Sequence, residues 1–256
     1  MKHKPIIKTK MEGISMTRQN IRKAIIVFSF LLFPITLYYF SPYLIIQGAI
    51  EGIITGSFIV FLTMLVTSIF FGRLFCGWIC PAGGLQECAI IVKDKRAKGG
   101  KLNRIKYFIW AFWIIIIISI SISVGGFKMV DFFYQTTYGI SVANPYAFII
   151  YYGVVFLIFG LSLFAGKRSF CHYVCWMAPF MVIGLRIRGI LKIPYFHLAV
   201  EKEKCIDCKQ CTKKCPMSLD VNENVKIDKI QNDECILCLE CVDACPKKVI
   251  SLKFDK

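Results

Sequence analysis

The chain has 256 residues, 56% of them hydrophobic, and a formal net charge of +16 at pH 7. Soluble globular chains are about 45–50% apolar, so this composition argues against an ordinary soluble enzyme. It also excludes intrinsic disorder, because disordered chains are poor in large apolar residues. The thirteen cysteines are an odd number, which excludes complete intrachain disulfide pairing. The composition indicates a membrane protein that carries metal.

The basic charge lies before residue 200. Residues 1–200 hold 21 Lys and Arg against 5 Asp and Glu, whereas residues 201–256 hold 11 of each together with eight of the cysteines. We therefore predict three parts: a basic cytoplasmic arm at 1–23, a transmembrane domain at 24–193 and a cysteine-rich domain at 194–256.

Four apolar stretches are each long enough to span a bilayer, which takes about 20 helical residues. They cover residues 24–40, 53–71, 105–124 and 146–165. A fifth stretch, 179–193, is too short and too charged to span, so we expect a helix in the interface with its apolar face in the lipid. The segment 42–50 is expected to lie along the opposite surface. A buried soluble helical core is the alternative, but four such stretches leave almost no polar faces.

The basic residues fall on one side of these spans. Of the 21 before position 200, 20 lie in the N-terminal arm, the loop after the second span and the segment after the fourth, and Lys128 alone lies opposite. Cytoplasmic loops keep the positive charge, so we expect a multi-pass protein of the cytoplasmic (inner) membrane with both termini in the cytoplasm. The arm reads as a retained anchor, since no small-residue cleavage site follows its apolar run. Topology accounts for the charge, and no nucleic-acid partner is expected.

The tail contains the pattern C-x2-C-x2-C-x3-C-P twice, which is the spacing of a bacterial ferredoxin with two [4Fe–4S] clusters. Three thiolates hold one cubane and the fourth cysteine reaches the other. The first cluster should therefore use Cys205, Cys208, Cys211 and Cys245. The second should use Cys235, Cys238, Cys241 and Cys215. Zinc usually takes two separated pairs, and a reducing compartment disfavours disulfides. Ile206 and Ile236 are expected to shield the clusters from water.

Two C-x3-C pairs each follow a predicted span on its cytoplasmic side, Cys76 with Cys80 and Cys171 with Cys175. Residues i and i+4 share one face of a helix, so all four thiols can converge at one membrane depth. Three interpretations stay open: a metal or third cluster bound by all four, a redox-active dithiol relay that could handle copper, and inert packing thiols. Cys88 has no partner at such spacing and is expected to be structural.

The stretch GRLFCGWICPAGGLQE at 72–87, the second C-x3-C pair and the double ferredoxin pattern resemble the membrane-bound ferredoxin-type proteins of the NapH, NosR and CcoG kind. The resemblance covers most of the chain. Family members often have C-x3-C-P twice, but here Trp176 stands in place of the second proline, which recurs only at Pro179. The resemblance implies electron transfer at the cytoplasmic membrane face, with partners that differ between subfamilies.

Other candidate residues carry weaker signals. None of the three histidines, His3, His172 and His197, lies inside a predicted span, so a bis-histidine haem is not expected. His172 beside Cys171 could ligate metal or donate a hydrogen bond, although an interfacial role is the simpler interpretation. Outer charges (Glu51, Lys128, Asp131) are read as loop charges rather than a quinone site. The basic cluster 93–106 could dock an acidic partner, although topology is a sufficient reason for it. No nicotinamide or flavin motif is found.

We therefore predict an α-helical membrane protein with four transmembrane helices and a small α+β ferredoxin domain with two [4Fe–4S] clusters at the C-terminus. Its expected function is to pass single electrons between a soluble cytoplasmic donor and a membrane or outward-facing acceptor, such as a quinone or a redox protein. It reads as an electron-transfer subunit of an oxidoreductase system rather than a stand-alone enzyme, and we assign no catalytic residue. The alternatives are a membrane copper reductase that acts through the C-x3-C thiols and a non-redox iron–sulfur sensor or assembly factor.

Overall fold

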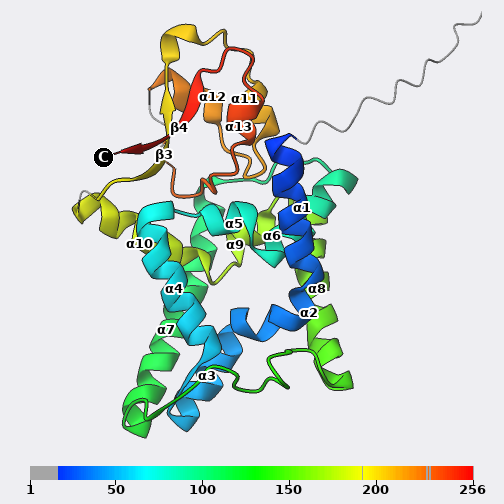
Figure 1. Cartoon of the computed structure of the whole chain (residues 1–256), viewed down its shortest axis with the longest axis vertical. Helices are drawn as coiled ribbons and strands as arrows, with labels where there is room; N and C mark the ends of the chain where they lie inside the picture. Colours follow the sequence, from blue (N-terminus) through cyan, green and yellow to red (C-terminus); the bar gives the residue numbers. More distant parts are fainter. Residues whose placement is uncertain (1–16, 192, 229, 231, 256) are drawn as a thin grey trace, which may run out of the picture.

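A computed structural model describes residues 17–191, 193–228, 230 and 232–255. Most of the expected basic arm, residues 1–16, lies outside the described residues. The described part is largely helical and forms three layers (Figure 1). Long apolar helices form the lowest layer, short helices with the C-x3-C motifs form the middle layer, and the cysteine-rich tail lies above them.

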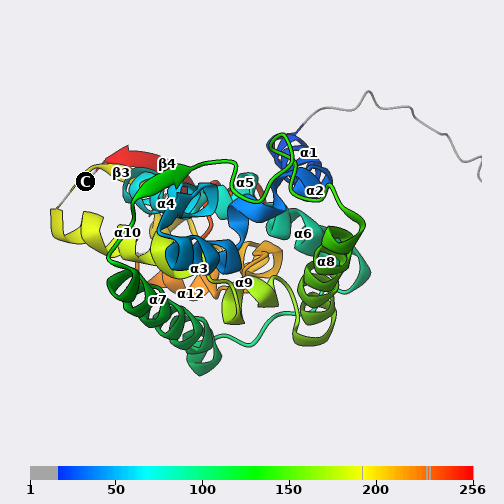
Figure 2. The ribbon, with the colours of Figure 1, turned by 90° about the horizontal axis from the view of Figure 1, so that it is seen from below.

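Two helices in the described part are long and apolar enough to cross a membrane, α7 (Ile105–Val124) and α8 (Pro145–Ala165). Their outer faces expose large apolar side chains such as Phe112, Phe156 and Phe164. Exposed apolar surface on this scale marks a membrane or protein contact. Seen from below, the two helices lie at separate edges of the molecule (Figure 2). The expected helices over 105–124 and 146–165 are confirmed.

The chain bends within the span expected over 24–40, so this stretch is not one continuous helix. It is divided into α1 (Arg18–Leu31), α2 (Phe33–Thr36) and the 3₁₀ helix η1 (Leu37–Phe40), with an angle of 57° at the break. Pro34 lies in the first turn of α2. Proline has no N–H to continue the preceding helix, and its ring clashes with the turn before it. The pair is one broken span or a re-entrant loop.

The expected span over 53–71 is shorter than its apolar run. Its first residues form β1 (Ile53–Thr55), which pairs in parallel with β2 (Met129–Asp131). The helix α4 (Gly56–Phe71) that follows has 16 residues, fewer than the roughly 20 of a straight span. Before β1, α3 (Pro42–Glu51) is the helix expected over 42–50.

The helix α10 (Ala178–Leu191) covers the stretch expected to lie in the interface. Its Met181 and Val182 are buried, and a Cβ atom on Gly184 would lie 1.8 Å from the Ser68 Oγ of α4. Only glycine allows the two helices to approach so closely. The first half of α10 therefore packs inside the protein against α4, whereas Ile190 and Leu191 at its end are exposed.

The middle and upper layers contain the cysteine motifs. The middle layer comprises α5 (Leu74–Trp78), α6 (Pro81–Val92), η2 (Gly100–Arg104) and α9 (Ser169–Tyr173). In the tail, β3 (Tyr195–Val200) pairs antiparallel with β4 (Ile250–Asp255), with Val200 opposite Ile250. Its short helices are η3 (Lys202–Lys204), α11 (Gln210–Lys214), α12 (Val221–Lys226) and α13 (Glu240–Asp243).

Candidate metal centres

The eight tail cysteines line two separate cavities, four to each. One cavity is lined by Cys205, Cys208, Cys211 and Cys245. The other is lined by Cys215, Cys235, Cys238 and Cys241. Each set combines the first three cysteines of one motif with the last cysteine of the other. These are the two groupings expected from the ferredoxin spacing.

The two cysteine loops have the same backbone conformation. In the first loop Asp207 and Lys209 have φ of 53° and 56°, and the equivalent Leu237 and Leu239 have φ of 49° and 64°. Positive φ is uncommon for residues other than glycine and marks a loop that its surroundings hold in place. The sequence repeat is thus a structural repeat, and each loop wraps around its own cavity.

The chemistry of the cavities fits iron–sulfur clusters. Burial raises the pKa of Cys235 to about 11 and that of Cys238 to about 12, so without metal these thiols are protonated, and a metal must supply the charge that favours the thiolate. Among the described residues, no group of three or more His, Cys, Asp or Glu side chains is placed to hold a metal ion. In a [4Fe–4S] cubane each thiolate binds a different iron atom, so its four cysteines lie farther apart than the ligands of a single metal ion.

Equivalent residues around the two cavities differ in their exposure to solvent. Ile236 is 1% exposed beside the second cavity, as expected of a residue that excludes water, whereas Ile206 is 57% exposed. Ile206 nevertheless lines the first cavity, so its expected function as a shield stays a prediction. Cys208 is exposed as well, while its equivalent Cys238 is buried.

The two C-x3-C pairs adopt one shared geometry. The first cysteine of each pair lies in a five-residue helix, Cys76 in α5 and Cys171 in α9, and the second follows the end of that helix. The N–H groups of Cys80 and Cys175 each donate to the carbonyl five residues earlier, at 2.9 Å in both cases. The assumption of one regular helix through each pair is therefore wrong.

All four C-x3-C thiols are buried and lie in one neighbourhood. Burial raises the pKa of Cys80, and the nearby Cys76, Cys171 and Cys175 raise it further. Burial also raises the pKa of Cys175 to about 12, with Cys171 and Cys76 adding to the effect. The four thiols influence one another across the two motifs, so the chain brings together the residues that the spacing singled out.

Two buried arginines accompany these thiols, each three residues before the first cysteine of its motif. Arg73 opposes the effect of burial by lowering the pKa of Cys76, and Arg168 donates to the Cys76 carbonyl at 2.7 Å. Within the described atoms, Arg73 Nε and Nη2 and Arg168 Nε have no hydrogen-bond partner. Unpaired cationic donors beside four thiols suit an anionic thiolate–metal group.

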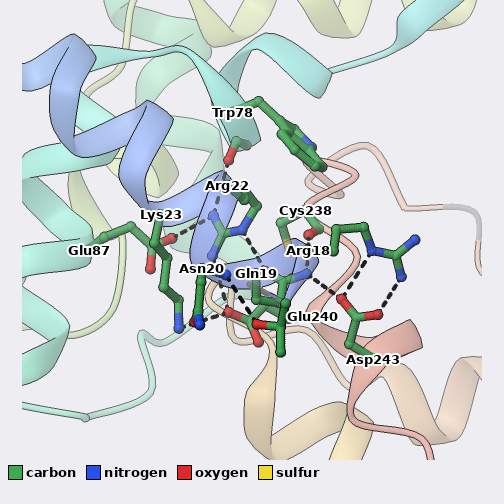
Figure 3. Close-up of polar contacts among 12 residues, drawn as sticks. Arg18, Gln19, Asn20, Arg22, Lys23, Trp78, Glu87, Cys238, Glu240 and Asp243 are labelled. Atoms are coloured by element: carbon green, nitrogen blue, oxygen red, sulfur yellow. Dashed lines mark hydrogen bonds and ion pairs between the residues drawn. The ribbon is translucent and has the colours of Figure 1, made fainter. Parts of the chain in front are cut away.

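The second cysteine loop of the tail is docked onto α1 through polar contacts (Figure 3). Gln19 donates to the Cys238 carbonyl at 3.0 Å, and Arg18 pairs with Asp243. The buried Arg22 contacts Glu240 and Glu87, at 3.1 Å each. Glu87 also accepts from Arg168 at 2.7 Å. One carboxylate therefore links α1, α6 and the second C-x3-C motif.

A second set of contacts fixes the other side of this loop. Glu234 lies directly before Cys235 and pairs with the buried Arg73 and Lys106. Although burial acts to raise it, these two cations lower the pKa of Glu234 to about 2. Trp78 donates to the Leu237 carbonyl at 3.0 Å. The docked loop thus lies directly on the residues that surround Cys76.

His172 of α9 contacts the tail just after Cys215, the last cysteine of the first ferredoxin motif. Its Nε2 donates to the Met217 carbonyl at 2.9 Å, and its Nδ1 faces Asn103. Burial lowers the pKa of His172 to about 4, so the ring is neutral at pH 7. The sequence left open whether His172 ligates metal or donates a hydrogen bond, and in the structure it donates a hydrogen bond.

A large apolar cavity lies beside the C-x3-C motifs in the lower layer. Its volume is about 510 Å³, within the 300–1,000 Å³ common for small-molecule sites. Three of its lining residues adjoin the thiols in sequence: Pro81, Phe170 and Trp176. The rest include Phe33, Leu37, Val154 and Ile158, with Tyr38, Tyr43, Gln47 and Gln135 as polar groups.

Several contacts in the structure were not predicted from the sequence. The basic stretch 93–106 was explained by topology, yet Lys106 pairs with Glu234 and Arg96 pairs with Asp220 of the tail. The repeat of Arg-x-Phe-Cys at 73–76 and 168–171 was the available signal for the two buried arginines. Cys88 is half-buried with no disulfide, and His197 faces Asp255 at 3.4 Å across the β3–β4 pair.

Comparisons with known proteins match these segments to iron–sulfur families. Residues 53–98 and 147–194, which contain the two C-x3-C motifs, match a family described as a 4Fe-4S binding domain. Residues 204–250 match a 4Fe-4S dicluster domain. No solved structure matches the chain.

Named relatives cover much of the chain at low identity. An uncharacterized protein of Methanocaldococcus jannaschii is 28% identical over 205 residues, which are 74% of this chain and 71% of that protein. The methylamine utilization ferredoxin-type protein MauN of Methylobacillus flagellatus is 22% identical over 69% of this chain and 60% of its own length. The ferredoxin-type protein NapH of Haemophilus influenzae is 24% identical over 56% of this chain and 47% of its own length.

Proposed function

We propose that this NapH-like ferredoxin-type 4Fe–4S protein is membrane-anchored and passes single electrons between a cytoplasmic donor and an acceptor in or at the membrane. The observation that carries the proposal is the docking of the second cysteine cavity onto the C-x3-C layer. Gln19, Trp78 and Arg73 hold the 233–238 loop directly above the four buried thiols. The C-x3-C layer therefore lies between the cysteine-rich tail and the apolar helices.

The proposed topology has four spans and the three domains predicted from the sequence, at 1–23, 24–193 and 194–256. α7 and α8 are two spans, and the bent pair of α1 with α2 and η1 and the shorter α4 supply the other two. The distribution of basic residues supports a tail, with its two [4Fe–4S] clusters, on the cytoplasmic side of the inner membrane. An impermeant thiol or lysine label applied to intact cells should leave the tail unmodified.

We propose the eight tail cysteines as the cluster ligands, grouped as they line the two cavities. The clusters supply one-electron redox chemistry, which ligation, hydrogen bonds to sulfur and burial tune. The chain's own residues hold and cover them. Ile236 excludes water from the second site, and Val249 donates its N–H to the Cys245 sulfur at 3.4 Å.

The C-x3-C thiols are proposed as a third redox site between the tail and the membrane. Arg73 and Arg168 would balance the negative charge of a cluster or metal held by Cys76, Cys80, Cys171 and Cys175. Iron and acid-labile sulfide are measured in a variant with all eight tail cysteines changed to serine. Residual iron that disappears on the further change Cys76→Ser supports the site, and an iron-free variant refutes it.

The apolar cavity beside these thiols fits a lipophilic acceptor, and we propose a quinone. Trp176 and Pro81 line it, so a ligand there lies next to the third site. The change Val154→Trp fills the cavity, and it should abolish reoxidation of the reduced protein by a quinone analogue. Phe156→Trp, at an exposed position of the same helix, is the matched control and should retain full reoxidation.

A copper reductase is the second candidate, favoured by one contact. The Cys76 thiol donates to the Met181 sulfur at 3.7 Å, and thiolate together with thioether is a ligand set that prefers Cu(I). Reduced protein is mixed in turn with Cu(II) and with a quinone analogue. Reoxidation by the quinone alone supports electron transfer. Reoxidation by Cu(II) that is lost in Met181→Leu favours the reductase, and clusters that neither acceptor oxidises contradict both functions.

A further inference from the structure

The tail presents two related cysteine loops, and among the described residues they make different contacts with the rest of the chain. The two cysteine motifs are related by a shift of thirty positions in sequence, and their loops share the same positive-φ residues. In the second motif, Leu237, Glu240 and Asp243 meet Trp78, Arg22 and Arg18 respectively. This surface is covered by α1 and α5.

Among the described residues, no such contacts cover the corresponding loop of the first motif at 206–209. Ile206 is 57% exposed where Ile236 is 1% exposed, and Cys208 is exposed where Cys238 is buried. In Figure 1 the segment that follows β3 rises to the end of the tail farthest from α4, α7 and α8. The first cavity therefore opens toward the side from which a soluble protein would approach.

The charges of the two surfaces are opposite. Where the docked motif has Leu239 and Asp243, the bare motif has Lys209 and Lys213. Lys247, which lines the first cavity, is exposed too. Within the described part of the chain none of these three lysines has an ion-pair partner, whereas the neighbouring Asp207 is held by Asn222 and Lys226. We call this surface the lysine rim: Ile206, Cys208, Lys209, Lys213 and Lys247.

We propose that the lysine rim docks an acidic, soluble one-electron carrier. The proposal rests on the proposed electron-transfer function and names the chemistry of its cytoplasmic partner. An exposed apolar residue surrounded by unpaired lysines matches a partner with an apolar centre and an acidic rim, because complementary charge steers the encounter and selects the partner. The exchange moves one electron from the reduced carrier to the protein, which oxidises the carrier by one electron. No bond forms or breaks.

The test uses the full-length protein in detergent and flavodoxin as an acidic probe. Binding of oxidised flavodoxin is measured by titration, and the rate of electron transfer from its hydroquinone is measured separately by stopped flow. The test variant is Lys209→Glu with Lys213→Glu. The control is Lys93→Glu with Lys253→Glu, which changes the net charge equally at exposed positions outside the lysine rim.

The rim variant should bind flavodoxin about tenfold or more weakly and accept electrons correspondingly more slowly, because steering by complementary charge is worth about 10- to 1,000-fold in rate. Added salt should slow the wild type and the control but not the rim variant. Basic cytochrome c should oxidise the reduced rim variant faster than the wild type. Equal losses in both variants, or salt-independent wild-type rates, overturn the docking surface and leave the electron-transfer function standing. Clusters that no low-potential reductant reduces overturn both.

Discussion

Gly77 allows a direct test of the contact between the tail and the C-x3-C layer. A Cβ atom at this position would lie 2.3 Å from the Ile236 carbonyl oxygen and 3.5 Å from the Cys238 Cα. The first contact involves backbone and cannot be relieved by a side-chain rotation. In Gly77→Ala the 235–239 loop must therefore move away from α5, by about 1 Å if the methyl group is to reach an ordinary van der Waals distance.

The magnitude follows from two opposing effects. Alanine favours the helix α5 by about 1 kcal/mol over glycine, but this gain is present whether the tail is docked or open, so it does not favour docking. Overpacking costs about 1–3 kcal/mol in the docked state alone. Since about 1.4 kcal/mol is a factor of ten, opening of the loop should increase about 5- to 150-fold.

Hydrogen exchange at the amides of residues 235–239 measures this opening in the detergent-solubilised protein. Gly153→Ala is the control, because a Cβ atom there meets nothing within 4 Å. Gly77→Ala should exchange these amides faster than the wild type, and the control should exchange them at the wild-type rate. Unchanged exchange at 235–239, with normal iron content, would refute the docking geometry.

The remaining predictions concern buried charge and helix packing. Glu234→Gln leaves Arg73 and Lys106 buried without their carboxylate, so docking should weaken by about 3–5 kcal/mol; the same exchange experiment checks this, with the exposed Glu223→Gln as a control that should change nothing. Gly184→Leu places atoms inside Ser68 of α4 and should cost at least about 1–3 kcal/mol. The midpoint of thermal unfolding in detergent should fall, whereas Gly189→Leu, where a Cβ meets open space, should not lower it.

The parts of the molecule that the sequence predicted are those set by short-range pattern. The spacing of the tail cysteines already placed Cys215 with the second set and Cys245 with the first, and both lie there. The helices α7 and α8 followed from uninterrupted apolar runs. In each case the information lies within a few residues of the feature, so no knowledge of the tertiary fold was needed.

The parts that the sequence did not predict depend on partners far along the chain. The bend at Leu32 and the shortening of α4 follow from Pro34 and from pairing with β2, more than 70 residues later. The exposure of Ile206 and the burial of Ile236 cannot be told apart from the motif, because both follow the first cysteine. They differ only because one surface of the tail is docked.

The distribution of charge in the tail explains which surface docks. The tail is neutral in sum, but residues 233–243 contain four acidic residues and no basic one, and three of the four meet arginine or lysine of the α1 and C-x3-C layers: Glu234, Glu240 and Asp243. Turning the tail to present its other motif would bring Lys209 and Lys213 against Arg18 and Arg22. Like charges in a partly buried contact repel strongly. The basic residues of α1 and the C-x3-C layer therefore favour docking of the second cysteine site over the first.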